Sequence, residues 1–262
     1  MIGVLKGQPF HKISCRSAAV AMVVSALSAP AFAADLRLPV KAPPVPPVQV
    51  FSWTGLYVGA NGGWGSSRNC WDLVPPTPLP PALLGPEGCH DATGAVAGGQ
   101  IGYRWQTGPV VLGLEAQGNW ADLNGSNVSP LFPTTTNRSR IEAFGLFTGQ
   151  IGWAVQNALF YVKGGAAATD SRFRYTDNAT AAILGAARDT RWGGTAGVGL
   201  EFGFASNWSI AVEYDHLFMQ GHTFDFASPA GAYAGTLAIR QDVDLVTARV
   251  NYRFGGPVVA KY

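Results

Sequence analysis

The chain has 262 residues, of which 13% are charged and 47% hydrophobic, and its 18 basic residues nearly balance its 16 acidic ones. The charged share is about half the ~25% of an average soluble domain, and the 33 glycines exceed average usage. An ordinary cytosolic enzyme does not have this composition. The apolar fraction excludes intrinsic disorder. Beyond about residue 35, no apolar run approaches the ~18 residues of a membrane-spanning helix.

The N-terminus has the three parts of a secretory signal peptide. Three basic residues precede the apolar run 18–27, and the small-residue cleavage pattern Ala31-Phe32-Ala33 follows it. We expect residues 1–33 to be removed after Sec-type export. Removal takes away three bases and no acids, which leaves a nearly neutral mature chain. The basic isoelectric point of the precursor therefore implies no nucleic-acid partner.

Two further features follow the signal peptide. Residues 34–50 are rich in proline, which suits an extended periplasmic linker rather than a folded domain. Cys70 and Cys89 remain after cleavage, and export takes them to an oxidising compartment. We expect a disulfide that pins the proline-rich segment between them as a loop; two free thiols are the alternative.

From residue 51 onward, apolar and polar side chains alternate with period two, which is typical of half-buried strands. In chain order the segments with this pattern are 56–60, 99–105, 110–120, 141–153, 160–166, 192–204, 210–214 and 246–254. The third, sixth and eighth segments show it most clearly. In the fourth segment we assign Ile141 to the apolar phase. The sequence predicts eight strands in a domain that spans residues 51–262.

The connections between these segments alternate in length. The second, fourth and sixth are short, near 106–108, 155–157 and 205–207. The other four are about twenty residues long and rich in Pro, Asn, Ser and Thr, as are the external loops of an up-and-down outer-membrane barrel. A soluble eight-stranded barrel or sandwich is the alternative, because period two alone does not exclude it.

Tryptophan placement decides between these two folds. Tryptophans recur at both ends of the predicted strands, as expected for aromatic belts at the two membrane–water interfaces. We therefore predict an all-β fold, an eight-stranded antiparallel up-and-down transmembrane β-barrel with periplasmic termini. The predicted interface aromatics are Trp53, Trp105, Trp153, Trp208, Tyr252 and Phe254 on the turn side, and Trp64, Trp120 and Trp192 on the loop side.

The opposite phase of the strands carries a nearly balanced set of charges. Eight strands enclose a lumen that side chains just fill, whereas aqueous channels need about sixteen. Because buried charges must pair, we expect a plugged, salt-bridged lumen. The predicted lumen charges are Arg104, Glu115, Arg140, Glu142, Lys163, Glu201, Glu213, Asp215, Arg249 and Arg253.

Motifs at both ends of the domain resemble a known family. The opening FSWTGLYVGAN at 51–61, GGQIGY at 98–103, GLE at 113–115 and the closing VNYRFGGPVVAKY at 250–262 resemble the alphaproteobacterial outer-membrane immunogenic protein family, small porin-like, opacity-type barrels. The resemblance implies an abundant outer-membrane surface antigen. It also implies an aromatic assembly signal near the C-terminus, either Phe254 or Tyr262.

Three functions remain open from the sequence. The first is a non-enzymatic structural and surface-antigen barrel that presents four external loops and contributes to envelope integrity. The second is a narrow porin-like solute channel. The third is an outer-rim lipid or peptide hydrolase in which His216, close to acids, acts as a general base.

The expected partners follow from this location. They are outer-membrane lipids and lipopolysaccharide, the barrel-assembly machinery during biogenesis, and cell-wall or host surfaces. His90, His216 and His222 lack metal-ligand spacing, so we expect neither a metal nor another cofactor.

Overall fold

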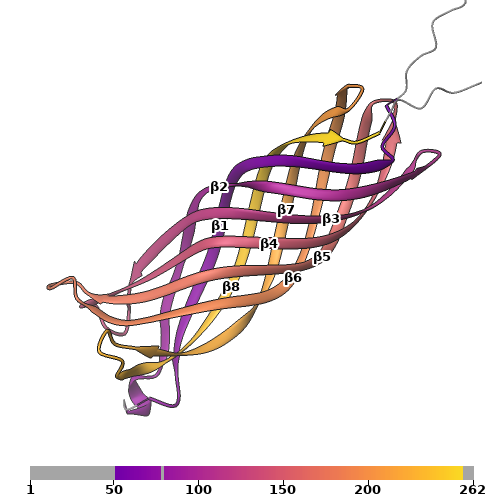
Figure 1. The fold of residues 1–262 in the computed structure, drawn as a ribbon. Coiled ribbons are helices and arrows are strands. Elements are labelled where there is room, and N and C mark those ends of the chain that lie inside the picture. Colours follow the sequence, from indigo (N-terminus) through magenta and orange to yellow (C-terminus); the bar gives the residue numbers. More distant parts are fainter. Residues whose placement is uncertain (1–50, 78–79, 256–262) are drawn as a thin grey trace, which may run out of the picture. The chain divides into compact units, whose positions relative to one another are not determined.

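A computed structural model describes residues 51–77 and 80–255, so the expected signal peptide, the linker 34–50 and Tyr262 lie outside the described residues. The described chain forms eight strands in a closed antiparallel barrel, which confirms the predicted fold (Figure 1). The strands are β1 (Gly55–Val74), β2 (Gly85–Thr107), β3 (Val110–Val128), β4 (Thr135–Val155), β5 (Ala158–Asp177), β6 (Ile183–Ala205), β7 (Trp208–Ala227) and β8 (Tyr233–Arg253). One 3-10 turn, η1 (Pro81–Leu83), lies between β1 and β2. No helix among the described residues is long and apolar enough to cross a membrane.

Each strand pairs with the next along the chain, and β8 closes the barrel against β1. In the closing pair, Asn61 lies opposite Arg249 and Trp64 opposite Val246. The ring is therefore closed and has no free edge strand, the kind of strand that promotes aggregation in open sheets.

The two ends of the barrel differ. At one end, which we call the turn end, the connections are residues 108–109, 156–157 and 206–207. At the other, the loop end, they are residues 75–84, 129–134, 178–182 and 228–232. The expected loops of about twenty residues were too long. Most of their residues instead extend the strands, which reach up to 23 residues, as in β2 and β6.

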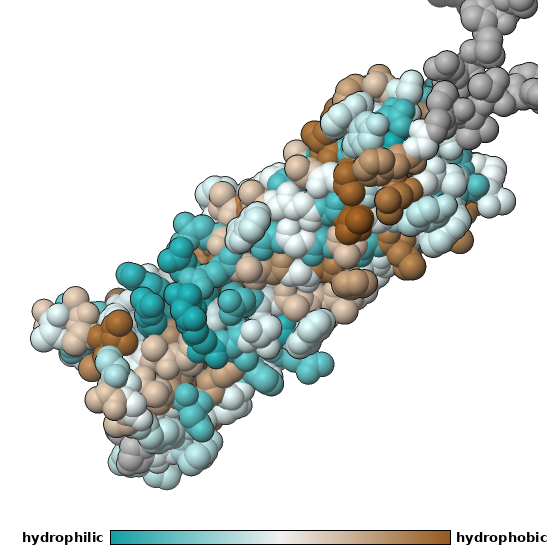
Figure 2. Space-filling view, viewed as in Figure 1, coloured by the Kyte–Doolittle hydropathy of each residue, from teal (hydrophilic) through white to brown (hydrophobic). Residues whose placement is uncertain are grey.

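The barrel turns apolar side chains outward. The side chains of Leu112, Phe147, Phe160 and Val198 are all at least half exposed. Apolar patches cover part of the outer surface in Figure 2. A soluble barrel places these side chains inside, so the outer face is built for an apolar surrounding. Six of the predicted interface tryptophans lie on this outer face, three toward each end: Trp105, Trp153, Trp208, and Trp64, Trp120, Trp192. We call the last three the outer aromatic ring.

Glycines make room for two tyrosines inside the barrel. Tyr57 lies opposite Gly102, and Tyr161 lies opposite Gly199, in neighbouring strands. A Cβ on Gly102 would lie 2.5 Å from the Tyr57 ring, and one on Gly199 would lie closer still to the Tyr161 ring. Any larger residue would collide with the ring, so each glycine makes room for the tyrosine opposite it.

The predicted disulfide is confirmed, but its setting differs from the prediction. Cys70 and Cys89 are joined at an S–S distance of 2.04 Å. They lie directly opposite each other in β1 and β2, so the bridge links two paired strands near the loop end rather than the base of a free loop.

Candidate functional site

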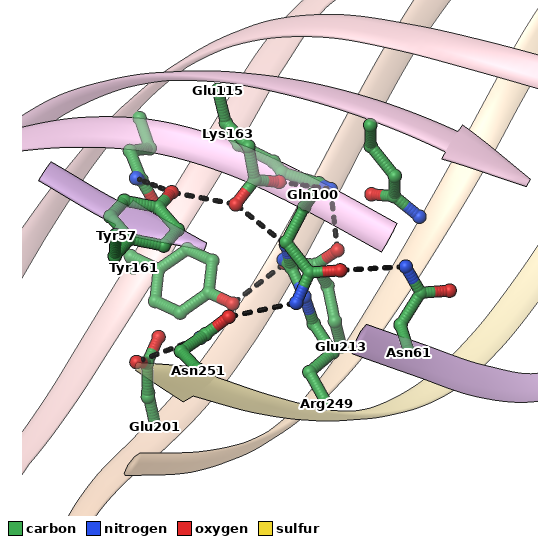
Figure 3. A network of polar contacts seen from close by, with 12 residues as sticks. Tyr57, Asn61, Gln100, Glu115, Tyr161, Lys163, Glu201, Glu213, Arg249 and Asn251 are labelled. Atoms are coloured by element: carbon green, nitrogen blue, oxygen red, sulfur yellow. Dashed lines mark hydrogen bonds and ion pairs between the residues drawn. The ribbon is translucent and has the colours of Figure 1, made fainter. Parts of the chain in front are cut away.

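Charged side chains that meet inside the barrel form the candidate site, which we call the lumen network. They are buried, and period-two alternation turns all of them inward. The network consists of Arg104 on β2, Glu115 on β3, Lys163 on β5, Glu201 on β6, Glu213 and Asp215 on β7, and Arg249 on β8. Figure 3 shows most of these side chains converging from different strands on one another.

Arg249 joins two acids that come from different strands. Its Nη2 donates to Glu115 Oε2 at 2.6 Å, and its Nη1 donates to Glu213. Lys163 donates to Glu213 as well, and its Nζ lies 3.1 Å from Asp215 Oδ2. Each of these buried charges therefore has an opposite charge in contact, which offsets the free energy lost when it leaves water.

Tyrosine hydroxyls supply further donors to the same acids. Tyr57 Oη donates to Glu115 Oε2 at 2.6 Å, and Tyr161 Oη donates to Glu213 Oε2 at 2.6 Å. These are the rings that rest against the glycines. The carboxylates accept several hydrogen bonds each, which holds them in one orientation.

A second ion pair lies toward the turn end. Arg104 Nη2 donates to Glu201 Oε2 at 2.8 Å, and the guanidinium carbon of Arg104 lies 4.4 Å from the centre of the Tyr57 ring. Glu201 also accepts hydrogen bonds from Ser209 and, at 3.0 Å, from Asn251 Nδ2. Arg104 is thus held by a carboxylate on one side and an aromatic face on another.

Amide side chains connect this second pair to the rest of the lumen. Asn61 Nδ2 donates to Gln100 Oε1 at 2.7 Å, and Gln100 Nε2 donates to Asn251 Oδ1 at 2.7 Å (Figure 3). The lumen residues predicted from the sequence did not include Asn61, Gln100 or Tyr57. They share the inward phase of the alternation, so the signal that finds the charges would also have found them.

Aromatic side chains fill the turn end of the lumen. Trp53 is only 1% exposed, and its ring centre lies 4.5 Å from that of Phe51. The placement of Trp53 among the interface aromatics was therefore wrong. The residue precedes β1, so the alternation that orients strand residues does not apply to it, and the chain turns into the lumen instead. Arg253 also lies at this end, where it donates to the backbone carbonyls of Thr54 and Ser206 rather than to an acid.

An apolar cluster fills the loop end of the lumen. Trp71 is its centre, with ring centres 5.7 Å from Phe173 and 5.5 Å from Phe226. Ile239 and Leu237 complete the buried part of this cluster. The lumen network thus lies between aromatic side chains at both ends of the barrel.

A hydrogen-bond chain runs beside this apolar cluster. Trp71 Nε1 donates to Ser139 Oγ at 3.2 Å, and Ser139 Oγ lies 2.9 Å from His90 Nε2. His90 Nδ1 lies 2.7 Å from Asn127 Oδ1, an acceptor. Nδ1 therefore carries the proton in neutral His90, and Nε2 accepts from Ser139. Burial is the main cause that lowers the pKa of His90 below its ordinary value, so the neutral form prevails.

Two predicted lumen charges lie on the outer face instead. A β-bulge near Ile141 shifts the phase of β4 against β5 by one residue. Ile141 therefore points into the core, and Arg140 and Glu142 are turned away from the lumen. Outside, Arg140 pairs with Asp122 at 2.9 Å, and Glu142 pairs with Arg172 at 2.6 Å. The assignment of Arg140 and Glu142 to the lumen was wrong.

The histidine considered as a general base also lies on the outer face. His216 Nδ1 is 2.7 Å from Asp244 Oδ1, which accepts a hydrogen bond from Tyr214 Oη as well. Across the other neighbouring strand, His216 lies opposite Ala196, which offers no hydroxyl or thiol to activate. Among the described residues, no group of three or more His, Cys, Asp or Glu side chains could hold a metal ion.

The chain is similar to known outer-membrane proteins over nearly the whole barrel. Residues 19–254 match the family model described as the outer membrane protein beta-barrel domain. The 31 kDa outer-membrane immunogenic proteins of Brucella melitensis biotype 1 and Brucella suis biovar 1 are each 30% identical to the chain over 217 residues. These matches cover 76% of the chain and 85% of each relative.

Solved structures with a similar arrangement share little sequence. Ail, the attachment invasion locus protein of Yersinia pestis, is 12% identical with a TM-score of 0.38, and the match covers 77% of this chain and 99% of Ail. OprG of Pseudomonas aeruginosa is 9% identical with a TM-score of 0.45, and the match covers 78% of this chain and 99% of OprG.

Proposed function

The chain belongs to the outer membrane protein beta-barrel domain family and, within it, to the outer-membrane immunogenic proteins, and from this premise we propose that it is a non-enzymatic surface protein. In this role a closed barrel anchors the loop end outside the cell and contributes to the integrity of the envelope. The N- and C-termini lie in the periplasm after Sec-type export. The barrel-assembly machinery inserts it, and cell-wall or host surfaces contact its exposed parts.

The paired lumen network is the observation that supports an anchor over a channel. Arg249 and Lys163 each contact two or more acids across the lumen, and these side chains are nearly inaccessible to solvent. A solute or a column of water would have to break buried ion pairs, which costs several kcal/mol each. The narrow channel considered from the sequence gains no support from this arrangement.

The shape of the barrel supports the orientation. The turn end has connections of two residues each, as periplasmic turns have in bacterial outer-membrane barrels. The strands at the loop end run on well past the outer aromatic ring: β1, for example, continues ten residues beyond Trp64 to Val74. That extension, with its four connections, is the part of the protein offered to the outside.

Protease treatment of intact cells tests this orientation. We expect proteinase K to cut residues 75–84 in intact cells, because this connection is the longest at the loop end. The two fragments should stay together on a gel until a reductant is added, because the Cys70–Cys89 bridge spans the cut. The linker 34–50 should be cut only after the outer membrane is permeabilised. Cleavage of 75–84 only in permeabilised cells would reverse the topology.

A further inference from the structure

Five arginines lie side by side on the outer face near the loop end, and we call them the arginine ladder. Arg172 on β5 lies directly opposite Arg140 on β4 and Arg188 on β6. Two residues further along β4 and β5 toward the loop end, Arg138 lies opposite Arg174. All five side chains are on the outer face, and Arg138, Arg174 and Arg188 are exposed.

This arrangement is unfavourable for the barrel alone. Like charges directly opposite in neighbouring strands destabilise a sheet, and opposite charges stabilise it. The other side of the same outer face follows the favourable rule, because Arg68 on β1 lies between Asp91 on β2 and Asp242 on β8. Interactions within the barrel therefore do not explain why arginines face each other on β4, β5 and β6.

Acids within the chain neutralise only part of the ladder. Arg140 pairs with Asp122, and Arg172 pairs with Glu142. Arg138, Arg174 and Arg188 have no ion pair within residues 51–77 and 80–255. Three guanidinium groups on three adjacent strands thus remain open to an anion from outside.

The height of the ladder identifies the anion. Arg188 lies four residues along β6 from Trp192, a member of the outer aromatic ring, and both side chains face outward. Four residues span ~13 Å along a tilted strand, and an arginine side chain reaches several ångströms back, so the Arg188 guanidinium group reaches the headgroup layer above the apolar band. Arg138 and Arg174 lie two residues further along their strands toward the loop end. Figure 2 shows hydrophilic side chains gathered on this side between the apolar surface and the loop end.

From this placement we propose that the arginine ladder is a binding site for the phosphate groups of lipopolysaccharide in the outer leaflet. Guanidinium forks bind phosphate oxygens in pairs, and several forks in a row match a headgroup with more than one phosphate. The bound anion relieves the repulsion between facing arginines. The proposal rests on the outward orientation of the loop end. It selects a lipid over a soluble polyanion because the lower row of the ladder, in which Arg172 lies between Arg140 and Arg188, is about four residues along the strands from the aromatic ring.

Binding of lipid A to the purified full-length barrel tests the proposal. The probes are diphosphorylated lipid A and its dephosphorylated form, each titrated onto the protein in uncharged detergent micelles. The triple variant R138Q/R174Q/R188Q should bind the diphosphorylated form about tenfold more weakly, because it loses three partly exposed charge contacts. Wild-type affinity should fall as salt is raised, and the dephosphorylated form should bind wild type and variant alike.

Arg68 supplies the matched control. It is an exposed arginine on the same outer face, flanked by Asp91 and Asp242, so R68Q should bind diphosphorylated lipid A within about twofold of wild type. Thermal stability without lipid should not fall in the triple variant, because the substitutions remove like-charge contacts. Equal affinity of wild type and triple variant would overturn the proposal, as would an equal loss in R68Q.

Two further outcomes separate this proposal from its alternatives. If heparin binds wild type more tightly than lipid A and needs the same three arginines, the site serves a soluble polyanion and the lipid proposal is wrong. The proposed function is judged separately, by the protease topology and by conductance. A barrel that conducts ions can still bind lipid A, and a closed barrel can fail to bind it.

Discussion

Arg249 shows how single residues keep the lumen closed. Its two terminal nitrogens donate to Glu115 and Glu213, acids that come from different strands. Lys163 contacts Glu213 closely but lies 3.9 Å from Glu115. Loss of Arg249 would therefore leave Glu115 buried with only a distant cation and the Tyr57 hydroxyl.

We predict that R249L lowers the free energy of unfolding by about 3–5 kcal/mol, because removal of one partner strands a buried charge. The matched control is R240L on the same strand. Arg240 is 71% exposed and pairs with Asp72 at the surface, so its loss should cost no more than about 1 kcal/mol. Denaturant titration in detergent micelles, followed by gel mobility of the folded barrel, measures both values. Equal effects of the two substitutions would show that the buried lumen pairs contribute no more to the free energy of unfolding than the exposed pair does.

The direction of each side chain, inward or outward, was predictable from the sequence wherever the alternation continued without a break. Lys163, Glu213 and Arg249 occupy the polar phase of regular strands, so their inward direction followed from counting by two. Counting by two gave the wrong direction for Arg140 and Glu142, because a bulge adds one residue to β4. Nothing in the local composition marks this bulge. Counting by two also gave the wrong direction for Trp53, because this residue precedes β1 and the strand alternation does not apply there.

At the scale of elements, the loop-end extensions of the strands were the least predictable part. The predicted third, fifth and seventh connections contain many residues that the structure places in strands, such as Arg138 and Arg174. Beyond the outer aromatic ring, the outer face carries charged side chains such as Arg138 and Arg174, and the inner face holds Asn137, Ser139 and Ser171 as well as Phe173. Both faces are therefore partly polar, and the period-two contrast that reveals a strand in a membrane disappears.

We expect His90 to make these extensions sensitive to pH, because its buried ring holds hydrogen bonds to Asn127 and Ser139. Burial lowers the pKa of His90, so folding favours its neutral form. This contribution to stability is complete above the ordinary histidine pKa of about 6.5, and it is lost as the pH falls through the lower pKa of the folded state. We predict that backbone amides in 127–139 exchange faster at pH about 5 than at about 7.5, after correction for intrinsic rates.

The substitution H90Q tests the assignment, because glutamine keeps hydrogen-bonding groups but does not titrate. The pH dependence of exchange in 127–139 should disappear in H90Q. It should persist in H222Q, because the His222 side chain is 62% exposed. A pH dependence that survives in H90Q would show that another group controls the loop end.

The barrel as a whole is an eight-stranded ring filled from end to end. Aromatic side chains around Trp53 occupy the turn end, the lumen network occupies the middle, and the cluster around Trp71 occupies the loop end. Strand number sets this outcome, because eight strands leave an interior that side chains can fill. Strand number and the balance of inward charges were both readable from the sequence, which is why the closed lumen was predictable although its individual contacts were not.

Single-channel recording in planar bilayers tests the closed lumen most directly. The refolded wild-type protein is compared with a sixteen-stranded porin in the same bilayer and salt, and insertion is verified by the resistance of the folded barrel to protease. We predict no large, steady conductance at either polarity, because the ion pairs of Arg249, Lys163 and Arg104 leave no continuous water column. Steady wild-type openings as large as those of the sixteen-stranded porin would contradict the account.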